Sequence, residues 1–373
     1  MKVALVHDWL NGMRGGEKCL ELFCANLPTD TPIHTLFHVP GSVSATIESH
    51  PIRTSPLAAR REIAKRYQRH LLSFPRAIES FDLSGYDVVL SSHHCVAKGV
   101  RTGPQTKHLC YIFTPMRYIW DQVGNYFAGA RRLLLPLAWP AIAHLRRWDK
   151  RTAAPVTRFV AISRYVAERV TRTYGRPADV VYPPVDVAGF RLAPEAGEHY
   201  VMVAADAAYK RVDLAVSAFA ALKIPLVIVG KRQDENPLAR TAPAHVTFRG
   251  FIPDAELKEL VRTSRGFLLP CHEEFGIAAV EAMAAGKPVV ALGGGAALET
   301  VRGALPDSPL PTDPTGVFFA REDAHELERA VRHLESNRSA FVPEAIRAHA
   351  MSFDQSLFWP RIKAHVDEIA EGA

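Results

Sequence analysis

With 373 residues the chain is longer than one typical domain, so we expect two domains. Its 48% hydrophobic and 23% charged residues are typical of a soluble globular protein and argue against a disordered chain. The net charge of +6 favours anionic partners, but nucleotides, anionic lipid and nucleic acid would all satisfy it.

The cysteines and the first residues indicate a cytoplasmic protein. The five cysteines include no C-x-x-C pair, and their odd number is typical of reduced thiols. The chain enters an apolar strand pattern at once, without the longer apolar region and cleavage site of a signal peptide. No apolar run reaches the ~18 residues that would span a membrane.

The N-terminal strand pattern, residues 3–6, ends at an H-D-W-L motif. A loop with Gly15 and Gly16 follows, before a helix that we expect over residues 18–26. Adjacent glycines let the main chain approach a ligand, and a helix N-terminus offers unpaired N–H groups to an anion. A plain turn that needs positive φ is the open alternative, because the spacing matches neither the dinucleotide fingerprint nor the phosphate loop.

Strand patterns recur at residues 88–91, 108–112 and 159–162, with helical stretches between them. This alternation predicts a parallel sheet with helices on both faces.

Two segments of this half are basic and apolar together. Residues 55–80 carry six Lys/Arg against two acids, and residues 131–151 carry six against one. Such segments suit the interface of an anionic membrane. The alternative is a solvated cationic face over a packed stripe, which is favoured where Pro136 and Pro140 interrupt a long amphipathic helix.

A Y-P-P-V-D run at residues 182–186 places the domain boundary near residues 183–195. A second strand–helix series follows. We expect its strands at 200–204, 226–229 and 246–250, its helices at 211–222 and 254–263, and a last helix at 355–369 that packs back on the first domain.

A strand–turn–helix–strand stretch between residues 266 and 292 organises the second half. Its turn contains Glu273, its helix begins near Phe275, and Glu281 lies about two helical turns further on. Glu281 could accept hydrogen bonds from a ribose diol and Glu273 from sugar hydroxyls. Alternatively, Glu273 and Glu274 only favour the helix N-terminus as acidic residues of its first turn.

A nucleoside diphosphate leaving group needs its negative charge stabilised by a metal or by fixed donors. The chain has no D-x-D pair and no His/Cys/Asp cluster at metal spacing, so we expect no metal. Two cations and one helix N-terminus could supply the fixed donors. They are Lys210, Arg211, Gly276, Ile277 and Ala278. Lys210 and Arg211 could instead be a solvated helix start, although cations there oppose the helix dipole.

The E-x7-E pattern of Glu273 and Glu281, followed by A-M-A-A-G-K-P-V, resembles that of the retaining glycosyltransferases of family 4. Further motifs occur in the family's order, and those of the first half resemble a bacterial polysaccharide mannosyltransferase-like group. They are H-D-W-L with G-G-E (7–17), T-P-M-R-Y-x-W-D (114–121), Y-P-P-V-D (182–186), Y-K-R-V-D (209–213) and T-G-V-F-F (315–319).

The resemblance implies an α/β fold of the GT-B type, two Rossmann-like domains that face a central cleft. Residues 1–188 would form the acceptor-side domain and residues 189–350 the domain that binds the nucleotide sugar. Residues 351–373 would form a helix that crosses back to the first domain.

The resemblance also implies roles for the site residues. Glu281 would bind the ribose, Lys210 and the main chain of 276–278 the diphosphate, with Arg211 beside them, and Glu273 the donor sugar as the catalytic residue. Gly15 and Gly16 would close over the phosphates. In this family a departing phosphate oxygen is thought to deprotonate the acceptor on the same face, so that no protein nucleophile is required.

The acceptor side is less defined, with Asp8, His93 and Arg117 as candidates. Two positions depart from the family. Phe113 stands where a histidine commonly precedes the T-P segment, and A-A-D at 204–206 stands where many members carry arginine. These departures imply altered donor preference, slower chemistry or a lapsed enzyme.

The leading hypothesis is a metal-independent hexosyltransferase with GDP-mannose, favoured over UDP-sugars, as substrate and with no cofactor. Its acceptor would be a lipid-linked or polysaccharide (oligosaccharide) chain in cell-surface glycan synthesis, such as lipopolysaccharide, and no nucleic acid is expected to bind. The protein would be cytoplasmic, at the inner face of the membrane. The alternative is a non-catalytic sugar-nucleotide binder or assembly subunit. A GT-B epimerase or phosphorylase and an oxidoreductase rank lower, since the sequence shows no pyridoxal phosphate site or dinucleotide fingerprint.

Overall fold

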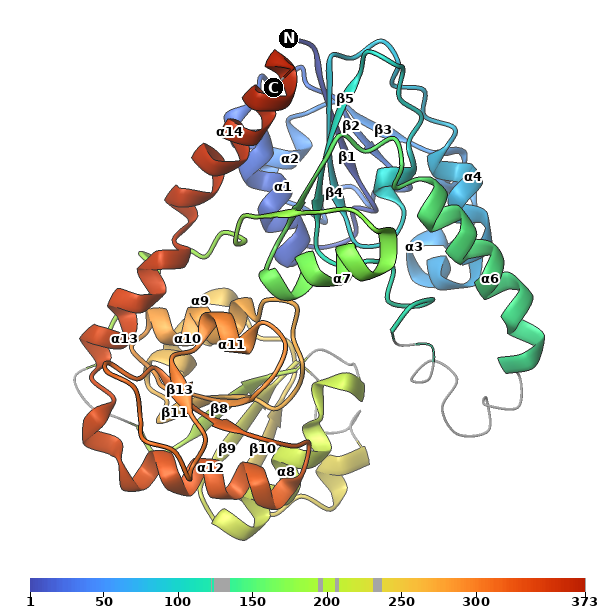
Figure 1. The fold of residues 1–373 in the computed structure, drawn as a ribbon. Coiled ribbons are helices and arrows are strands. Elements are labelled where there is room, and N and C mark those ends of the chain that lie inside the picture. The colour runs from blue at the N-terminus through green and yellow to red at the C-terminus, as the bar shows by residue number, and fades with distance from the viewer. Residues whose placement is uncertain (122, 124–134, 194–196, 205–207, 231–236, 373) are drawn as a thin grey trace. The chain divides into compact units, whose positions relative to one another are not determined.

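The computed structural model describes residues 1–121, 123, 135–193, 197–204, 208–230 and 237–372 (Figure 1). The chain forms two compact units. Unit 1 comprises Met1–Pro183 together with Phe358–Ala373, and unit 2 comprises Pro184–Leu357. Among the helices of these ranges, none combines the length and apolar character that a bilayer crossing requires.

Unit 1 is built on a seven-stranded parallel sheet in the order β3-β2-β1-β4-β5-β6-β7, which confirms the predicted α/β class. Its strands are β1 (Val3–His7), β2 (Ile33–Thr35), β3 (Ile52–Thr54), β4 (Val88–His93), β5 (Lys107–Ile112), β6 (Arg158–Ala161) and β7 (Asp179–Val180). Its helices are α1 (Gly15–Asn26), α2 (Ala45–Glu48), η1 (Pro56–Ala59), α3 (Ile63–Arg66), η2 (Tyr67–Ser73), α4 (Phe74–Ile78), η3 (Ala97–Gly99), α6 (Leu135–Arg151), α7 (Arg164–Tyr174) and α14 (Phe358–Glu371).

Unit 2 repeats the design with a second seven-stranded parallel sheet, in the order β10-β9-β8-β11-β12-β14-β13. Its strands are β8 (Tyr200–Val203), β9 (Leu226–Val229), β10 (Val246–Arg249), β11 (Gly266–Leu269), β12 (Val289–Leu292), β13 (Gly303–Ala304) and β14 (Gly316–Phe319). Its helices are η5 (Ala208–Lys210), α8 (Val212–Leu222), η6 (Pro237–Arg240), α9 (Asp254–Arg262), α10 (Ile277–Ala284), α11 (Ala297–Thr300), α12 (Ala324–Ser336), η7 (Arg338–Ala340), α13 (Pro343–Ala350), η8 (Met351–Phe353) and η9 (Gln355–Leu357).

In unit 1 the strand order reverses between β1 and β4. In unit 2 it reverses between β8 and β11, and again at the edge, where β13 lies beyond β14. Open parallel sheets bind ligands beyond the carboxyl ends of the strands at such a point. Asp8 follows β1, His94 follows β4 and Glu273 follows β11, so these residues lie where the topology favours a site.

The C-terminal helix α14 packs on unit 1, as predicted (Figure 1). Phe358 stacks on Phe23 of α1 with the ring centroids 5.5 Å apart. It also meets the ring of Tyr111 of β5 edge-on at 5.3 Å. These three rings are fully buried, so α14 completes the core on this face of the sheet.

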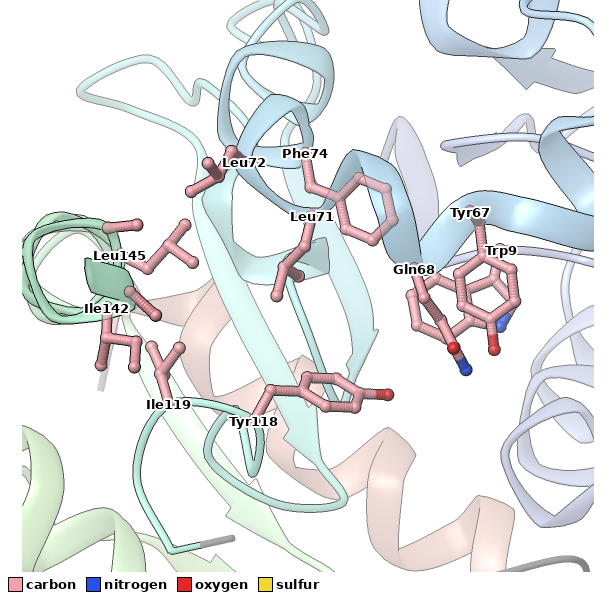
Figure 2. Close-up of a pocket in the computed structure, with 12 residues that line it drawn as sticks. Trp9, Tyr67, Gln68, Leu71, Leu72, Phe74, Tyr118, Ile119, Ile142 and Leu145 are labelled. Carbon is pink, nitrogen blue, oxygen red and sulfur yellow. The ribbon is translucent and has the colours of Figure 1, made fainter. Parts of the chain in front are cut away.

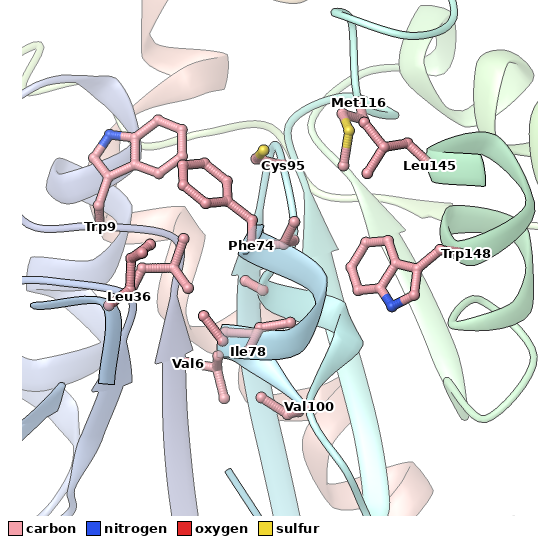
Figure 3. Packing of buried hydrophobic residues seen from close by; sticks show 14 of the residues in the cluster. Val6, Trp9, Leu36, Phe74, Ile78, Cys95, Val100, Met116, Leu145 and Trp148 are labelled. Atoms are coloured by element: carbon pink, nitrogen blue, oxygen red, sulfur yellow. The ribbon is translucent and has the colours of Figure 1, made fainter. Parts of the chain in front are cut away.

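The opposite face of the sheet is covered by α4 and α6 (Figure 3). Phe74 and Ile78 of α4 and Leu145 and Trp148 of α6 are buried there. We expected Pro136 and Pro140 to interrupt the α6 segment, and for Pro140 this expectation is wrong. The helix runs from Leu135 to Arg151 through Pro140, because its apolar contacts offset the hydrogen bond that this proline removes, whereas Pro136 lies in the first turn of the described helix.

A fully buried ion pair ties α6 to η3. The ammonium of Lys98 lies 2.5 Å from the Asp149 carboxylate and also donates to the Thr152 hydroxyl at 3.0 Å. The second oxygen of Asp149 accepts from the indole N–H of Trp120 at 2.7 Å and from the hydroxyl of Tyr174 at 2.9 Å. Both charges are therefore fully hydrogen-bonded, which a buried pair requires.

Replacing Lys98 with methionine should lower the free energy of unfolding of unit 1 by about 3–5 kcal/mol, because Asp149 would remain buried without its cation. The measurement is urea unfolding followed by tryptophan fluorescence. All five tryptophans belong to unit 1, so the signal reports this unit. The control Arg147→Met removes an exposed cation of the same helix and should change the value by less than about 0.5 kcal/mol. Equal midpoints for both variants would contradict the role of the ion pair.

Candidate functional site

The site of unit 2 is built from two turns that follow neighbouring strands. The acidic turn, residues 271–275, comes after β11, and a glycine turn, residues 293–295, comes after β12. Gly295 has φ of 61°, and the next N–H donates to the carbonyl of Glu273 at 3.0 Å. A Cβ at Gly294 would lie 2.3 Å from the His272 ring. Glycine at these positions lets the two turns touch, which fixes the main chain at Glu273.

Within unit 2 the structure brings Lys210 and Glu273 together as an ion pair. Their side chains are 18% and 12% exposed, and the thiol of Cys271 donates to the same carboxylate oxygen at 3.5 Å. Burial opposes the charged ammonium, but the Glu273 carboxylate outweighs it and raises the pKa of Lys210 above its usual range. The pair is partly accessible, so an anionic ligand can compete with Glu273 for the ammonium.

Helix α10 presents its N-terminus at the same turn. Gly276 is the N-cap residue with φ of 84°, and the helix begins at Ile277 rather than near Phe275. Glu273 and Glu274 thus precede the cap, and the first turn contains no acidic residue, so their alternative role as first-turn residues is not supported. Gly276, Ile277 and Ala278 are half-buried, which leaves the first N–H groups near accessible surface.

The other residues that we predicted to bind the nucleotide sugar differ in their surroundings. Glu281 lies half-buried within α10. Arg211, the N-cap residue of α8, forms ion pairs with Asp213 at 2.9 Å and with Glu322. Its charge is compensated by two carboxylates, whereas Lys210 is paired with one, that of Glu273. The described part of the chain contains no group of three or more His, Cys, Asp or Glu that could hold a metal ion.

In unit 1 the Asp8 carboxylate is an anchor at the point where the strand order reverses. It is fully buried and accepts hydrogen bonds from four consecutive main-chain N–H groups, those of residues 94–97, at 2.6–3.0 Å. It also contacts Nδ1 of His94 at 2.9 Å. Burial alone would raise the pKa of Asp8, but His94 and the main-chain donors hold it far below its usual range. Asp8 therefore fixes the turn after β4.

The two adjacent histidines of this turn have different environments. His93 is fully buried, and desolvation lowers its pKa to about 3. The side chain of His94 is 29% exposed, is held by Asp8, and meets Trp9 edge-on with centroids 4.5 Å apart. The predicted candidate His93 is thus buried, whereas its neighbour His94 is the more accessible imidazole of this turn.

The glycine loop forms the start of α1, which begins at Gly15, three residues earlier than predicted. Positive φ occurs at Gly12 and not at Gly15 or Gly16, so the alternative of a turn that needs positive φ does not apply to the pair. A Cβ at Gly16 would lie 3.5 Å from the rings of His7 and Phe113, an ordinary contact. The fold of unit 1 therefore does not require glycine at position 16.

Phe113 and Arg117, which follow β5, are half-buried, and the ring of Phe113 lies 6.5 Å from that of His94. Parts of two predicted segments lie outside the described residues. These are Ala205 and Asp206 of the A-A-D motif and residues 131–134 of the second basic segment.

Two family models match nearly the whole chain. The model described as Glycosyltransferase Family 4 matches residues 21–188, and the model described as Glycosyl transferases group 1 matches residues 190–350. A curated relative, the alpha-1,3/1,6-mannosyltransferase ALG2 of Kluyveromyces lactis, is 37% identical over 117 residues. That match covers 30% of this chain and 23% of the yeast protein, so the chain spans about a quarter of its length.

Solved structures of similar fold cover the chain end to end. Anabaena Alr3699/HepE in complex with UDP aligns with a TM-score of 0.70 at 15% identity, over 99% of this chain and 100% of that one. Sucrose-phosphate synthase from Thermosynechococcus elongatus has a TM-score of 0.68 at 15% identity, over 100% and 99%. WaaG, a glycosyltransferase involved in lipopolysaccharide biosynthesis, has a TM-score of 0.65 at 16% identity, over 100% of both chains. At these identities the likeness shows the fold.

The buried histidines of unit 1 should make its free energy of unfolding decrease as the pH is lowered. His93 and His108 have folded pKa values of about 3, against 6.5 for an ordinary histidine. Between these values the unfolded chain binds protons that the folded chain does not, so the stabilisation present above pH ~6.5 is lost progressively below it. The urea midpoint, followed by tryptophan fluorescence, should decrease from pH 7 to pH 5.

In a His108→Gln variant the urea midpoint should decrease less steeply with falling pH than in the unmodified protein, because the unfolded variant binds one proton fewer. His144→Gln, which changes an exposed histidine of α6, is the matched control and should run parallel to the unmodified protein. If the His108 variant also runs parallel, the histidine does not carry the pH dependence.

Proposed function

The chain belongs to the family 4 glycosyltransferases of GT-B fold, and we propose that it transfers mannose from GDP-mannose to a lipid-linked or polysaccharide acceptor, with retention of anomeric configuration. The observation that carries this proposal is the Lys210–Glu273 ion pair beside the N-terminus of α10. It combines a cation, main-chain donors and a carboxylate at the carboxyl end of β11. These groups suit a diphosphate joined to a sugar.

In the proposed reaction the ammonium of Lys210 leaves Glu273 and binds the donor diphosphate together with the N–H groups of residues 276–278. Glu281 accepts hydrogen bonds from the ribose. The bond between the anomeric carbon and the phosphate oxygen breaks, and the departing phosphate takes the negative charge, which these fixed donors stabilise. The departing oxygen accepts the proton of the acceptor hydroxyl as the new C–O bond forms on the same face. Glu273, released from Lys210, contacts the sugar hydroxyls.

The choice of GDP-mannose is supported by the resemblance of the N-terminal motifs and by the mannosyltransferase name of the yeast relative. Structural neighbours were solved with UDP or UDP-glucose, but at 15% identity they support a nucleotide sugar in general and not its base. Charge compensation by Lys210 and the α10 N-terminus makes metal-independent transfer the simpler proposal, with the donor as substrate and no further cofactor.

The acceptor side of the proposal rests on unit 1. Exposed cations and exposed apolar side chains occur together on η2 and α6, where Leu72 is 59%, Leu137 79% and Trp139 49% exposed. This combination suits the surface of an anionic membrane, as expected for segments 55–80 and 131–151. We therefore propose that the protein acts at the inner face of the cytoplasmic membrane in cell-surface glycan synthesis. The description of the neighbour WaaG, a glycosyltransferase involved in lipopolysaccharide biosynthesis, is in line with this proposal.

A second candidate function is sugar-nucleotide binding without transfer. The observation in its favour is Phe113, an apolar ring at the carboxyl end of β5, where members of the family commonly carry histidine. His94 offers an imidazole nearby, which favours retained activity.

Among a panel of nucleotide sugars, GDP-mannose should give the largest thermal stabilisation and the fastest release of nucleoside diphosphate. Stabilisation reports binding through mass action, and nucleotide release reports turnover. Binding without release for any donor, across lipid-linked and oligosaccharide acceptors, would support the non-catalytic alternative. If no GDP-sugar is hydrolysed or transferred, the mannose donor is wrong.

Lys210→Met should lower kcat by about 10²–10³-fold, because the departing phosphate loses a fixed positive partner. Arg211→Met is the matched comparison on the adjacent residue. The Arg211 variant should lower kcat less than about tenfold, since Asp213 and Glu322 already compensate that charge.

Glu273→Ala should lose most of the transfer activity while folding normally. Full activity of the Glu273 variant would contradict the role given to this carboxylate.

A further inference from the structure

Unit 1 contains an apolar pocket of about 390 Å³ between η2 and α6 (Figure 2). Leu71 and Leu72 form one wall, and Ile142 and Leu145 form the facing wall. The polar side-chain groups of the lining residues are the amide of Gln68, the hydroxyls of two tyrosines and the indole N–H of Trp9. The volume is typical of a pocket that holds a small molecule, and the lining suits a hydrocarbon.

Cationic side chains occur on or beside both helical segments that line this pocket, and we refer to them as its cationic rim. On one side Lys65, Arg66 and Arg69 are exposed and precede or belong to η2, and Arg66 forms an ion pair with Glu62 at 3.7 Å. On the other side the Arg146 guanidinium donates to the carbonyl of Ile119, a lining residue, at 2.7 Å and lies 5.1 Å from the ring of Trp139. An occupant with an apolar chain and an anionic head would satisfy both the lining and the rim.

The pocket adjoins the point where the strand order of unit 1 reverses. Trp9 lines the pocket and also packs edge-on against His94, the accessible histidine held by Asp8. A chain seated against Trp9 therefore ends beside the carboxyl ends of β1 and β4. This is where the proposed function requires the acceptor.

We propose that this pocket binds the hydrocarbon chain of a lipid-linked acceptor, whose phosphate lies on the cations of η2 and α6. The inference rests on the proposed function for its assignment to an acceptor. The pocket itself rests on its lining and its rim. It differs from docking of the basic segments on a membrane surface, because a single chain enters the protein and its length determines affinity.

The first test measures binding without vesicles and without transfer. The probe is 12-bromododecyl phosphate below its micelle-forming concentration, and its bromine quenches tryptophan fluorescence. We expect the quenching to saturate with probe concentration. Butyl phosphate should displace the probe at least a hundredfold more weakly than dodecyl phosphate does, because each buried CH₂ contributes about fourfold in affinity. Quenching that does not saturate, or equal competition by the short chain, would overturn the proposal.

Variants connect this binding to the pocket. Ala141→Phe fills the space between the walls and should weaken binding at least tenfold. His144→Ala is the matched control on the same helix, because His144 is exposed and does not line the pocket. It should bind as the unmodified protein does. Ala138→Leu, a smaller filling of the same lining, replaces the Phe variant if circular dichroism shows that the latter is unfolded.

The second test compares transfer to one acceptor sugar carried on butyl phosphate and on dodecyl phosphate. We expect a KM at least tenfold lower for the long chain, an advantage that Ala141→Phe loses while kcat is retained. Equal KM values would overturn the pocket as an acceptor site and leave the transferase intact. Saturable binding of the probe without any transfer would reject the proposed function and retain the pocket.

A third comparison excludes bulk lipid as the occupant. Binding to phosphatidylglycerol vesicles should be equal for Ala141→Phe and the unmodified protein. If the variant loses vesicle binding and the chain-length effect on KM is absent, the pocket holds a membrane phospholipid as an anchor, and its assignment to the acceptor is wrong.

Discussion

The arrangement of unit 1 depends on the buried carboxylate of Asp8. A buried charge persists only when it is fully hydrogen-bonded, and here four consecutive main-chain N–H groups supply the bonds. The carboxylate thereby joins the end of β1 to the turn after β4 and orients His94. The same turn leads into η3, whose Lys98 binds Asp149 and holds α6 in place. Asp8 thus helps to position both His94 and α6, which forms one wall of the apolar pocket.

The two units use ion pairs in opposite ways. The Lys98–Asp149 pair has no exposed surface and both carboxylate oxygens accept hydrogen bonds, so its geometry is fixed. The Lys210–Glu273 pair is partly exposed and is bounded by the N-terminus of a helix, so its cation can change partners. Burial therefore separates a pair that stabilises the fold from one that is suited to ligand exchange.

The central strands and the E-x7-E region could be predicted from sequence, because fully buried parallel strands form continuous apolar runs and the helix between β11 and β12 begins at a glycine-containing turn. Three features could not. The partners of Asp8 lie 86–89 positions away along the chain, so its anchoring role requires the fold. The start of α10 depends on the left-handed conformation of Gly276. The continuity of α6 through Pro140 depends on tertiary packing that outweighs local propensity.

The return of α14 to unit 1 has a consequence for biosynthesis. Unit 2 is one continuous segment, whereas unit 1 is completed by residues that follow it. Until Phe358 leaves the ribosome, Phe23 and Tyr111 lack the ring that covers them. The nascent N-terminal half therefore exposes an apolar face throughout the translation of unit 2, and such exposed surface is prone to aggregation. Unit 1 is therefore the first to be synthesised, but its core is completed only after unit 2.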